Sequence, residues 1–406
     1  MTPPLSSSAE PSNKGKGRLR IAVLNRTFSA TGGGAERYSI ALVEQLAARH
    51  EIHVFAQEID HQWPGVTYHR VDAPLRKSRW INQLWFATRT WLLTRRGFDV
   101  VHSHENTWHG DIQTVHVLPV KYNLFHERSG WRRVLRWIKV ASSPRLLAYL
   151  SLEHWRYATR QGRQVVVTSE SLRAIMESSY PACTAAISVI TPGITMPQLP
   201  VTPQRKNEAR ALLGLPCAGR CILFVANDYR KKGLPTLLEA LARLPVDVAL
   251  AVVGNPSQQA GFTAQVKALN LEKRVFFLGS LKNIAPAYEA ADCLAHPTLE
   301  DTFAMVVLEA MSHGLAVVVS GPRYCGVSEL LRHGVNAAIL DNPKDAAQLH
   351  QALERILTQT AVQNDLSQAA TAFAGDYQWS ELARKQELLY FSVLAQKARP
   401  LPGAAH

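Results

Sequence analysis

The chain has 406 residues, an apolar fraction of 47% and a formal net charge of +13 at neutral pH. Its length suffices for two or three domains, and its apolar fraction is that of a globular protein with large cores. No apolar run is long enough to cross a bilayer as a helix, so the sequence predicts no membrane span. The positive charge calls for an anionic partner: nucleic acid, an anionic membrane or a phosphorylated substrate.

The chain begins with a polar segment, residues 1–18, that is rich in Ser, Pro, Gly and Lys. This segment lacks the apolar stretch of a secretory signal, so we expect a disordered lead-in and a protein that stays in the cytoplasm. The five cysteines show no spacing typical of a zinc site or a disulfide framework. We therefore expect them to be reduced, buried thiols.

A first α/β domain is expected over residues 19–194. Short apolar strands alternate there with helical segments, and a Gly-rich loop separates the first strand from the first helix. The expected elements are strands at 20–24, 52–55, 99–102, 165–168 and 187–190, an apolar segment that ends at 115–116, the Gly-rich loop at 31–34 and a helix at 35–50.

The segment 195–207, rich in Pro and polar residues, is the expected linker to a second domain at 208–375. The expected strands of that domain lie at 221–226, 248–253, 275–278, 292–295, 316–320 and 338–340. Strands that alternate with helices on this scale predict a parallel sheet with helices on both faces, and the restart after the linker predicts two such domains.

The last helix is expected within 376–396, before a tail at 397–406. Its apolar members are Leu382, Leu388, Leu389 and Phe391. The pattern shows that the helix is amphipathic and does not show where it docks.

Two carboxylates, Asp301 and Glu309, stand eight residues apart where a buried strand gives way to a helix. A loop of this kind, at the carboxyl end of a strand, is where open α/β sheets bind their ligands. The N–H groups of Thr302, Phe303, Ala304 and Met305 would form the unpaired first turn of that helix, which suits a phosphate. Because carboxylates repel a phosphate, the natural partners of this pair are sugar and ribose hydroxyls.

A basic, Trp-rich segment covers residues 128–163. Within it, apolar residues fall at helical spacing and cations surround them, which is the composition of an interfacial helix. The expected membrane contacts are Trp131, Arg132, Arg133, Arg136 and Trp137. The alternative is a solvated helix whose apolar stripe packs on its own domain. Nucleic acid is disfavoured as the partner, because no recognisable reading module accompanies the charge.

The segment at 297–317, PTLEDTFAMVVLEAMSHGLAV, resembles the acidic-pair motif of the family 4 retaining glycosyltransferases, which have the GT-B fold. The resemblance extends over about residues 19–395, and its pieces stand in the family's order. They are the Gly-rich loop at 33–37 (GGAER), histidine segments at 99–102 (DVVH) and 114–116 (TVH), the lysine segment at 224–233 (FVANDYRKKG), shorter matches at 252–254, 277–279 and 288–292, and Trp379 at the start of the last helix.

The resemblance implies an α/β GT-B fold, with two doubly wound, Rossmann-like parallel-sheet domains that face each other across a cleft. The C-terminal helix would cross back to the first domain. In the cleft, Glu309 would hold the ribose hydroxyls of a nucleotide sugar, and Asp301 the hydroxyls of the transferred sugar. Gly33, Gly34 and residues 302–305 would line the donor site.

Lys232 matches the family's lysine that neutralises the donor diphosphate, with Arg230 or Lys231 as the second cation. Asn227 stands where the family often has an arginine. Cations and helix N–H groups can stabilise a departing diphosphate without a metal. Since the sequence has no Asp-x-Asp, we expect a metal-independent reaction and no cofactor.

Histidines mark the first domain. By resemblance, His116 would face the donor sugar and act with Lys232 and Asp301 in catalysis, although a lone histidine is often structural. His102, His104 and Glu105 are assigned to the acceptor side. A metal site formed by these residues with His109 is disfavoured, because strand ends rarely give closed coordination at this spacing.

Two positions depart from the family pattern: Ala304 stands where Gly is usual and Ala316 where Pro is usual. The extra methyl of Ala304 would crowd the donor pocket, which leaves the donor sugar open between UDP-linked and GDP-linked forms, with UDP favoured.

The resemblance implies transfer of a sugar from this donor to a hydroxyl of a lipid-linked or lipopolysaccharide glycan. The enzyme would belong to lipopolysaccharide core or envelope glycan synthesis and work at the inner face of the cytoplasmic membrane. Two alternatives remain open: another GT-B enzyme, such as a nucleotide-sugar epimerase, and a catalytically silent scaffold that binds membranes or partners. The acceptor, the linkage and the oligomeric state are not determined by the sequence.

Overall fold

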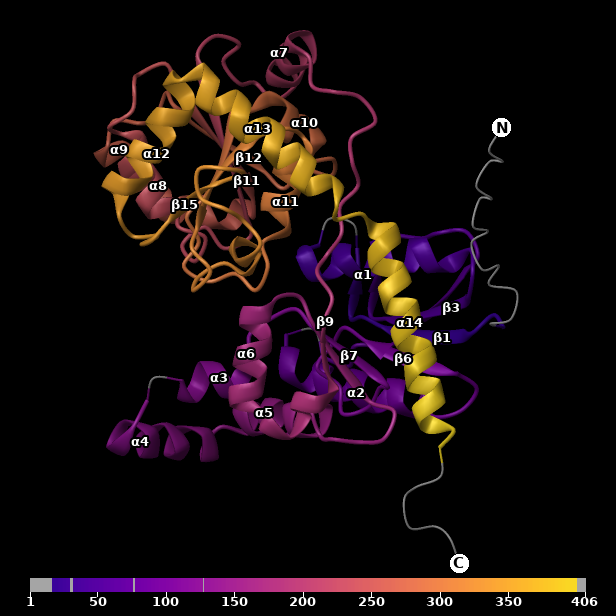
Figure 1. Ribbon diagram of the computed structural model, residues 1–406. Coiled ribbons are helices and arrows are strands. Elements are labelled where there is room, and N and C mark those ends of the chain that lie inside the picture. Colours follow the sequence, from indigo (N-terminus) through magenta and orange to yellow (C-terminus); the bar gives the residue numbers. More distant parts are fainter. Residues whose placement is uncertain (1–16, 30–31, 76, 127, 400–406) are drawn as a thin grey trace, which may run out of the picture.

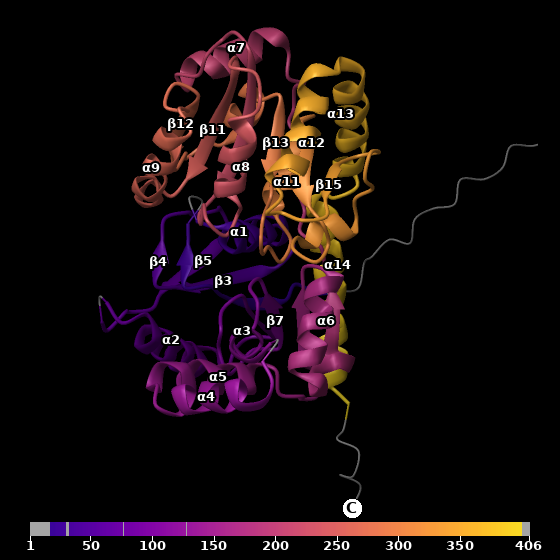
Figure 2. The same cartoon turned by 90° about the vertical axis from the view of Figure 1, so that its left-hand side faces the viewer.

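A computed structural model describes residues 17–29, 32–75, 77–126 and 128–399. Most of the predicted lead-in and tail, residues 1–16 and 400–406, lies outside this range, as do residues 30 and 31 of the Gly-rich loop. The described chain forms two α/β domains, stacked one above the other in Figures 1 and 2. The predicted GT-B architecture is therefore confirmed.

The N-terminal domain is built on a seven-stranded sheet of order β5-β3-β1-β6-β7-β8-β9, in which every neighbouring pair is parallel. Its inner strands are almost wholly buried, as expected for a parallel sheet with both faces covered. The strands are β1 (Arg20–Leu24), β3 (Glu51–Ala56), β5 (Val66–Arg70), β6 (Val100–Ser103), β7 (Ile112–Val115), β8 (Gln164–Val167) and β9 (Ile187–Val189). A separate parallel pair is formed by β2 (Thr27–Phe28) and β4 (Glu58–Ile59).

In this domain only a helix at 35–50 and helical spacing within 128–163 were predicted, so α2 (Arg79–Thr94) is among the helices that the sequence pattern did not predict. Strand β5 was also missed, because it lies at the sheet edge, is only partly buried and lacks an apolar run. The remaining helices are α1 (Gly34–Ala47), α3 (Val120–Phe125), α4 (Gly130–Ala141), α5 (Pro144–Arg156), α6 (Glu170–Ser179) and the 3₁₀ turn Pro181–Ala186.

The C-terminal domain carries a six-stranded parallel sheet of order β12-β11-β10-β13-β14-β15. Its strands match the predicted ones closely: β10 (Arg220–Ala226), β11 (Val248–Gly254), β12 (Val275–Gly279), β13 (Cys293–His296), β14 (Ala316–Ser320) and β15 (Ala338–Leu340). Its helices are α7 (Pro203–Leu212), α8 (Leu234–Leu241), α9 (Ala260–Ala268), α10 (Ala285–Ala290), α11 (Met305–Ser312), α12 (Ala346–Thr358) and α13 (Thr360–Gly375), with 3₁₀ turns at Pro256–Gln258 and Gly326–Glu329.

Helix α7 begins inside the predicted linker 195–207, so the second domain starts before residue 208. Thr202 caps the helix by accepting a hydrogen bond from the N–H of Arg205, and Pro203 occupies the first turn, where its missing N–H costs nothing. The helix packs against α10, and Lys206 and Arg210 both pair with Asp292. Proline here marks a helix start and not only a connection.

The last helix, α14 (Trp379–Lys397), crosses back and lies along the N-terminal domain beside α1, as the yellow ribbon shows in Figure 1. The hydroxyl of Tyr390 lies 2.8 Å from Nδ1 of His102, and Glu387 pairs with His50 at 2.8 Å. The buried face of the helix carries Tyr390 and Val393, whereas the predicted apolar member Leu388 is 49% exposed.

Candidate functional site

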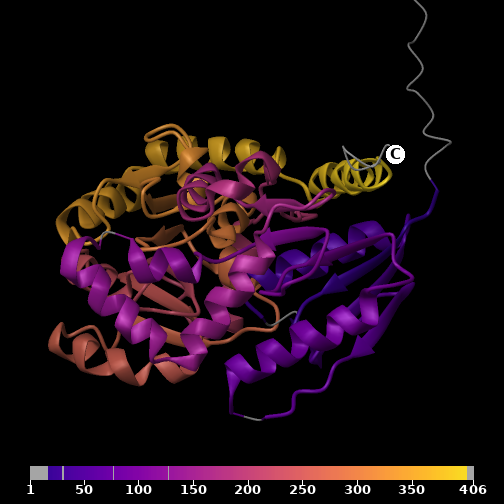
Figure 3. The same ribbon diagram turned by 90° about the horizontal axis from the view of Figure 1, so that it is seen from below.

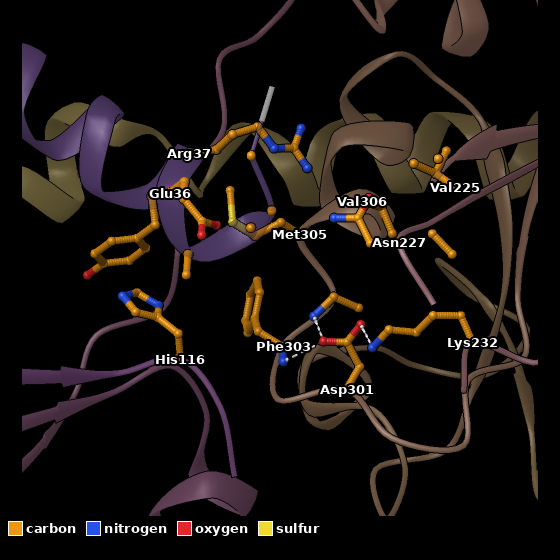
Figure 4. Close-up of a pocket in the computed structure, with 18 of the residues that line it drawn as sticks. Glu36, Arg37, His116, Val225, Asn227, Lys232, Asp301, Phe303, Met305 and Val306 are labelled. Atoms are coloured by element: carbon orange, nitrogen blue, oxygen red, sulfur yellow. Dashed lines mark hydrogen bonds and ion pairs between the residues drawn. The ribbon is translucent and has the colours of Figure 1, made fainter. Parts of the chain in front are cut away.

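A pocket of about 500 Å³ lies between the two domains. Both sheets turn the carboxyl ends of their strands toward it, which is the usual position of ligand sites in open α/β sheets. The N-terminal domain contributes the start of α1 and residues that follow β7 and β8, whereas the C-terminal domain contributes residues that follow β10, β12 and β13. Figure 4 shows both sets of side chains around this pocket.

The starts of α1 and α11 approach each other across this pocket. A Cβ placed on Gly34 would lie 3.6 Å from Sδ of Met305, so the Gly-rich loop lies against the first turn of α11. A Cβ on Gly32 would lie 2.7 Å from Cβ of Glu36, which excludes larger residues there. Because each helix N-terminus carries a partial positive charge, two such ends at one pocket favour an anionic ligand.

Asp301 organises the loop between β13 and α11. Its Oδ1 accepts hydrogen bonds from the N–H groups of Phe303 and Ala304, at 3.2 and 2.8 Å, and its Oδ2 lies 2.7 Å from Nζ of Lys232 (Figure 4). Burial favours the neutral acid, but Lys232 and His296 outweigh it and hold the pKa of Asp301 below its usual value. Asp301 is therefore a carboxylate at neutral pH.

This pairing changes the predicted phosphate site. We expected the N–H groups of residues 302–305 to be unpaired, but those of Phe303 and Ala304 bind Asp301. The helix itself begins at Met305, so its open N–H groups are that of Met305, which was predicted, and that of Val306, which was not; both residues line the pocket.

Ala304 has a left-handed backbone, with φ at 70°, and it directly precedes α11. An alanine in this conformation costs roughly 1 kcal/mol relative to glycine. The family's preference for glycine at this position is thus explained by the backbone conformation as well as by the space that a donor needs.

The predicted cations separate into two groups. Lys232 lines the pocket, and its Nζ also donates to the carbonyl of Glu300 at 2.7 Å. Arg230 and Lys231 do not line it: Arg230 lies over the ring of Phe262, and Lys231 pairs with Glu300 on the surface.

Two cations that the sequence analysis missed, Arg37 and Lys282, line the pocket instead. Lys282 follows strand β12, and its place after a strand's carboxyl end was a signal that could have found it. Arg37 was part of the recognised Gly-rich segment, but no role was given to its side chain.

Glu309 is held by both domains and is not among the residues that line the pocket. Its Oε1 lies 2.8 Å from Nη1 of Arg37, and its Oε2 accepts the hydroxyl of Tyr288 at 2.6 Å. Both carboxylate oxygens thus have protein partners in this structure.

His116 lines the pocket and is fixed from two sides. Its Nε2 lies 2.9 Å from Nδ1 of His104, and its carbonyl accepts the hydroxyl of Thr302 from the other domain at 2.7 Å. Burial, together with Arg156, lowers the pKa of His116 to about 3, so the ring is neutral at physiological pH. Only Nδ1 of this ring remains for a ligand.

The three residues assigned to the acceptor side lie behind the pocket and do not line it. His102 is fully buried between Thr114 and Tyr390 and anchors α14. His104 supports His116, and Glu105 accepts the N–H of Arg26. Within the described ranges, no group of three or more His, Cys, Asp or Glu side chains is placed to hold a metal ion.

The buried neutral histidines lead us to expect that the stability of the protein depends on pH. Burial lowers the pKa of His109 from 6.5 to about 3, and neither ring nitrogen has a partner among the described residues. Between these values the unfolded chain binds a proton that the folded chain does not, so stability falls as the pH decreases from about 6.5 to about 3. We expect His109→Gln to reduce this slope by about 1.4 kcal/mol per pH unit in urea unfolding between pH 6 and 4. A slope equal to that of the wild type would mean that folded His109 takes up the proton.

Two family models match the chain, each over one domain. The model described as Glycosyltransferase Family 4 matches residues 32–196, and the one described as Glycosyl transferases group 1 matches residues 206–373. The two matches follow each other without overlap and cover most of both domains. The chain belongs to the family 4 glycosyltransferases.

Curated relatives agree with this family. The D-inositol 3-phosphate glycosyltransferase of Corynebacterium urealyticum is 27% identical over 242 residues, which are 56% of this chain and 56% of that protein. The chain thus spans about half the length of the curated relatives it matches.

Solved structures of glycosyltransferases share the fold. WaaG, a glycosyltransferase involved in lipopolysaccharide biosynthesis, has a TM-score of 0.77 at 19% identity, over 93% of this chain and 100% of WaaG. Anabaena HepE, solved in complex with UDP-glucose, has a TM-score of 0.73 at 18% identity, over 92% of this chain and 100% of HepE. At these identities the likeness establishes the fold alone.

Proposed function

We propose that the protein transfers a sugar from a nucleotide-diphosphate donor to an acceptor hydroxyl, with retention at the anomeric carbon and without a metal. The observation that carries this proposal is the pair of Lys232 and Asp301 at the start of α11 in the interdomain pocket. A cation suited to phosphate and a carboxylate suited to hydroxyls stand there side by side, as a sugar joined to a diphosphate requires.

In this mechanism the diphosphate lies against the N–H groups of Met305 and Val306, with Lys232 beside it. These groups stabilise the negative charge that develops as the bond from the anomeric carbon to the leaving phosphate oxygen breaks. Asp301 accepts hydrogen bonds from hydroxyls of the sugar, and neutral His116 orients it. The acceptor oxygen bonds to the same face of the anomeric carbon, and its proton passes to the departing diphosphate, so no protein nucleophile is needed.

UDP-sugars are favoured as donors within this proposal. HepE, which shares the fold, was solved with UDP and with UDP-glucose. The pocket volume of about 500 Å³ suits a ligand of this size.

The acceptor in this proposal is a lipid-linked or lipopolysaccharide glycan at the inner face of the cytoplasmic membrane. WaaG, with the same fold, is involved in lipopolysaccharide biosynthesis. No helix among the described residues is long and apolar enough to span a membrane. The proposed contact with the bilayer is peripheral.

Helix α4 supports this membrane contact. It lies at the lower edge of the N-terminal domain in Figure 1, next to α5, and the view from below in Figure 3 shows this face. Its apolar stripe is not packed on the domain: Trp131 is 68% exposed and Ile138 is 60% exposed. Arg132 and Arg136 line an open groove on the same helix. An apolar stripe between cations suits an anionic lipid surface.

The donor is tested by measuring nucleotide release from a panel of UDP- and GDP-sugars, with and without membrane extract. Release or transfer that depends on extract and persists in EDTA is the expected result. Activity abolished by EDTA would contradict the metal-free mechanism. Isomerisation of the donor sugar without transfer would favour an epimerase, and nucleotide binding without turnover would favour a silent scaffold.

Membrane contact is tested by flotation with vesicles that contain anionic lipid. We expect the triple variant Trp131→Ala, Arg132→Ala, Arg133→Ala to lose most of the flotation of the wild type, because it loses two charges and an anchoring ring. The matched control is Lys267→Ala with Lys273→Ala, which removes two exposed charges from the other domain. Equal flotation of the triple variant and this control would contradict a membrane contact through α4.

A further inference from the structure

Each of the two motif carboxylates is paired with a cation in this structure. Asp301 pairs with Lys232 at 2.7 Å within the C-terminal domain. Glu309 pairs with Arg37 at 2.8 Å across the two domains. A donor that offers hydroxyls to the carboxylates therefore has to compete with both cations.

Arg37 is placed to meet such a donor. It belongs to the first turns of α1, beside the Gly-rich loop that lies against Met305, and it lines the pocket (Figure 4). Its side chain is 27% exposed, yet its Nε is buried and has no hydrogen-bond partner among the described residues. A buried guanidinium N–H without a partner indicates a missing acceptor.

The pocket also lacks a second cation where one was expected. Asn227 stands at the position where the family resemblance predicts an arginine, and Arg230 and Lys231 lie outside the pocket. Lys282 lines it, but its side chain is exposed and it follows strand β12, whereas Arg37 adjoins the two converging helix starts. An arginine also binds phosphate through two parallel N–H groups, which a lysine cannot do.

We propose that Arg37 is the second cation for the donor diphosphate and exchanges Glu309 for phosphate when the donor binds. This inference rests on the proposed function. Ribose hydroxyls then take the place of the guanidinium at Glu309, which keeps its bond from Tyr288. Arg37 then pairs with phosphate and Glu309 accepts hydrogen bonds from hydroxyls, so neither charged group is left without a polar partner, which would carry a large cost.

The exchange gives the N-terminal domain a part in holding the donor. The diphosphate lies between Lys232 of one domain and Arg37 of the other, so a ligand without phosphates does not connect the two domains. Affinity that depends on Arg37 should therefore appear with UDP and be absent with uridine, which keeps the ribose hydroxyls.

The test compares binding of UDP, by calorimetry, and of uridine, by ligand-observed NMR, to the wild type, Arg37→Gln and Arg230→Gln. GDP and guanosine are used in parallel. We expect Arg37→Gln to weaken the diphosphate by about 10- to 100-fold and to leave the nucleoside unchanged or slightly tighter. Arg230→Gln should change neither. Arg37→Lys, which keeps the charge and loses the paired geometry, should give an intermediate loss of diphosphate affinity.

Equal losses for diphosphate and nucleoside would overturn the inference, because Arg37 would then act only by positioning Glu309. Unchanged diphosphate affinity in Arg37→Gln would overturn it as well. Thermal unfolding of each variant shows whether a loss of affinity comes from a loss of stability. If Arg37→Gln is less stable than the wild type, the diphosphate affinity of Arg37→Lys is used to test the inference. A wild type that binds neither UDP nor GDP would instead contradict the proposed function itself.

Discussion

Lys232→Ala is expected to lower kcat/KM for the donor by about 10²- to 10³-fold, the usual effect of removing one group that stabilises a developing oxyanion. The loss has two sources. The leaving diphosphate loses its cation, and Asp301 loses the ammonium that holds it ionised at 2.7 Å. The measurement is release of the nucleotide from whichever donor the wild type turns over, with UDP affinity measured on the same variant.

The matched control is Lys231→Ala. This neighbouring lysine has the same charge, but its side chain pairs with Glu300 on the surface and does not line the pocket. Because exposed pairs contribute at most about 1 kcal/mol, we expect activity within a few-fold of the wild type. Comparable losses in both variants would indicate a general effect of surface charge and contradict the role of Lys232.

Gly233→Ala is expected to destabilise the C-terminal domain by about 3 to 5 kcal/mol, from backbone strain and steric overlap together. Gly233 has φ at 86°, in the region that favours glycine, and an added Cβ would lie 1.9 Å from the carbonyl oxygen of Pro297. That oxygen belongs to the backbone of the loop that carries Asp301, so it cannot move without displacing the site. The measurement is urea unfolding, with donor turnover measured in parallel.

Gly261→Ala provides the opposite expectation for the same substitution. Gly261 lies within α9, and no atom lies within 4 Å of the Cβ that alanine would add. Alanine is favoured over glycine in a helix, so stability should rise by about 0.5 to 1 kcal/mol. If both substitutions changed the free energy of unfolding by a similar amount, the contact with the carbonyl oxygen of Pro297 would not explain the effect of Gly233→Ala.

Much of the site could be predicted because the carboxyl ends of parallel strands meet at one edge of a sheet. His116, Lys232 and Asp301 follow three different strands, and the structure gathers all three around the pocket. Their residue types and their places after apolar runs were enough to select them. The roles given to these residues stay predictions.

Other parts of the site depended on the direction of side chains, which a pattern of residue types does not contain. Arg230, Lys231 and Lys232 are adjacent in sequence and lie in one turn, yet only Lys232 lines the pocket, whereas Arg230 lies over Phe262 and Lys231 pairs with Glu300. Asp301 accepts hydrogen bonds from the N–H groups of Phe303 and Ala304, which were predicted to bind phosphate. Neither arrangement follows from spacing alone.

The sequence by itself determined the fold class, the positions of most strands along the chain and several of the residues that line the pocket. Short apolar runs and helix signals are local, and the right-handed connections of parallel sheets leave few ways to assemble them. The tertiary structure alone decided which partners the charged groups take: Arg37 with Glu309, His104 with His116, and Tyr390 with His102. The first pair joins the two domains, the second joins the ends of two neighbouring strands and the third joins the last helix to the first domain, so each geometry exists only once these elements are packed together.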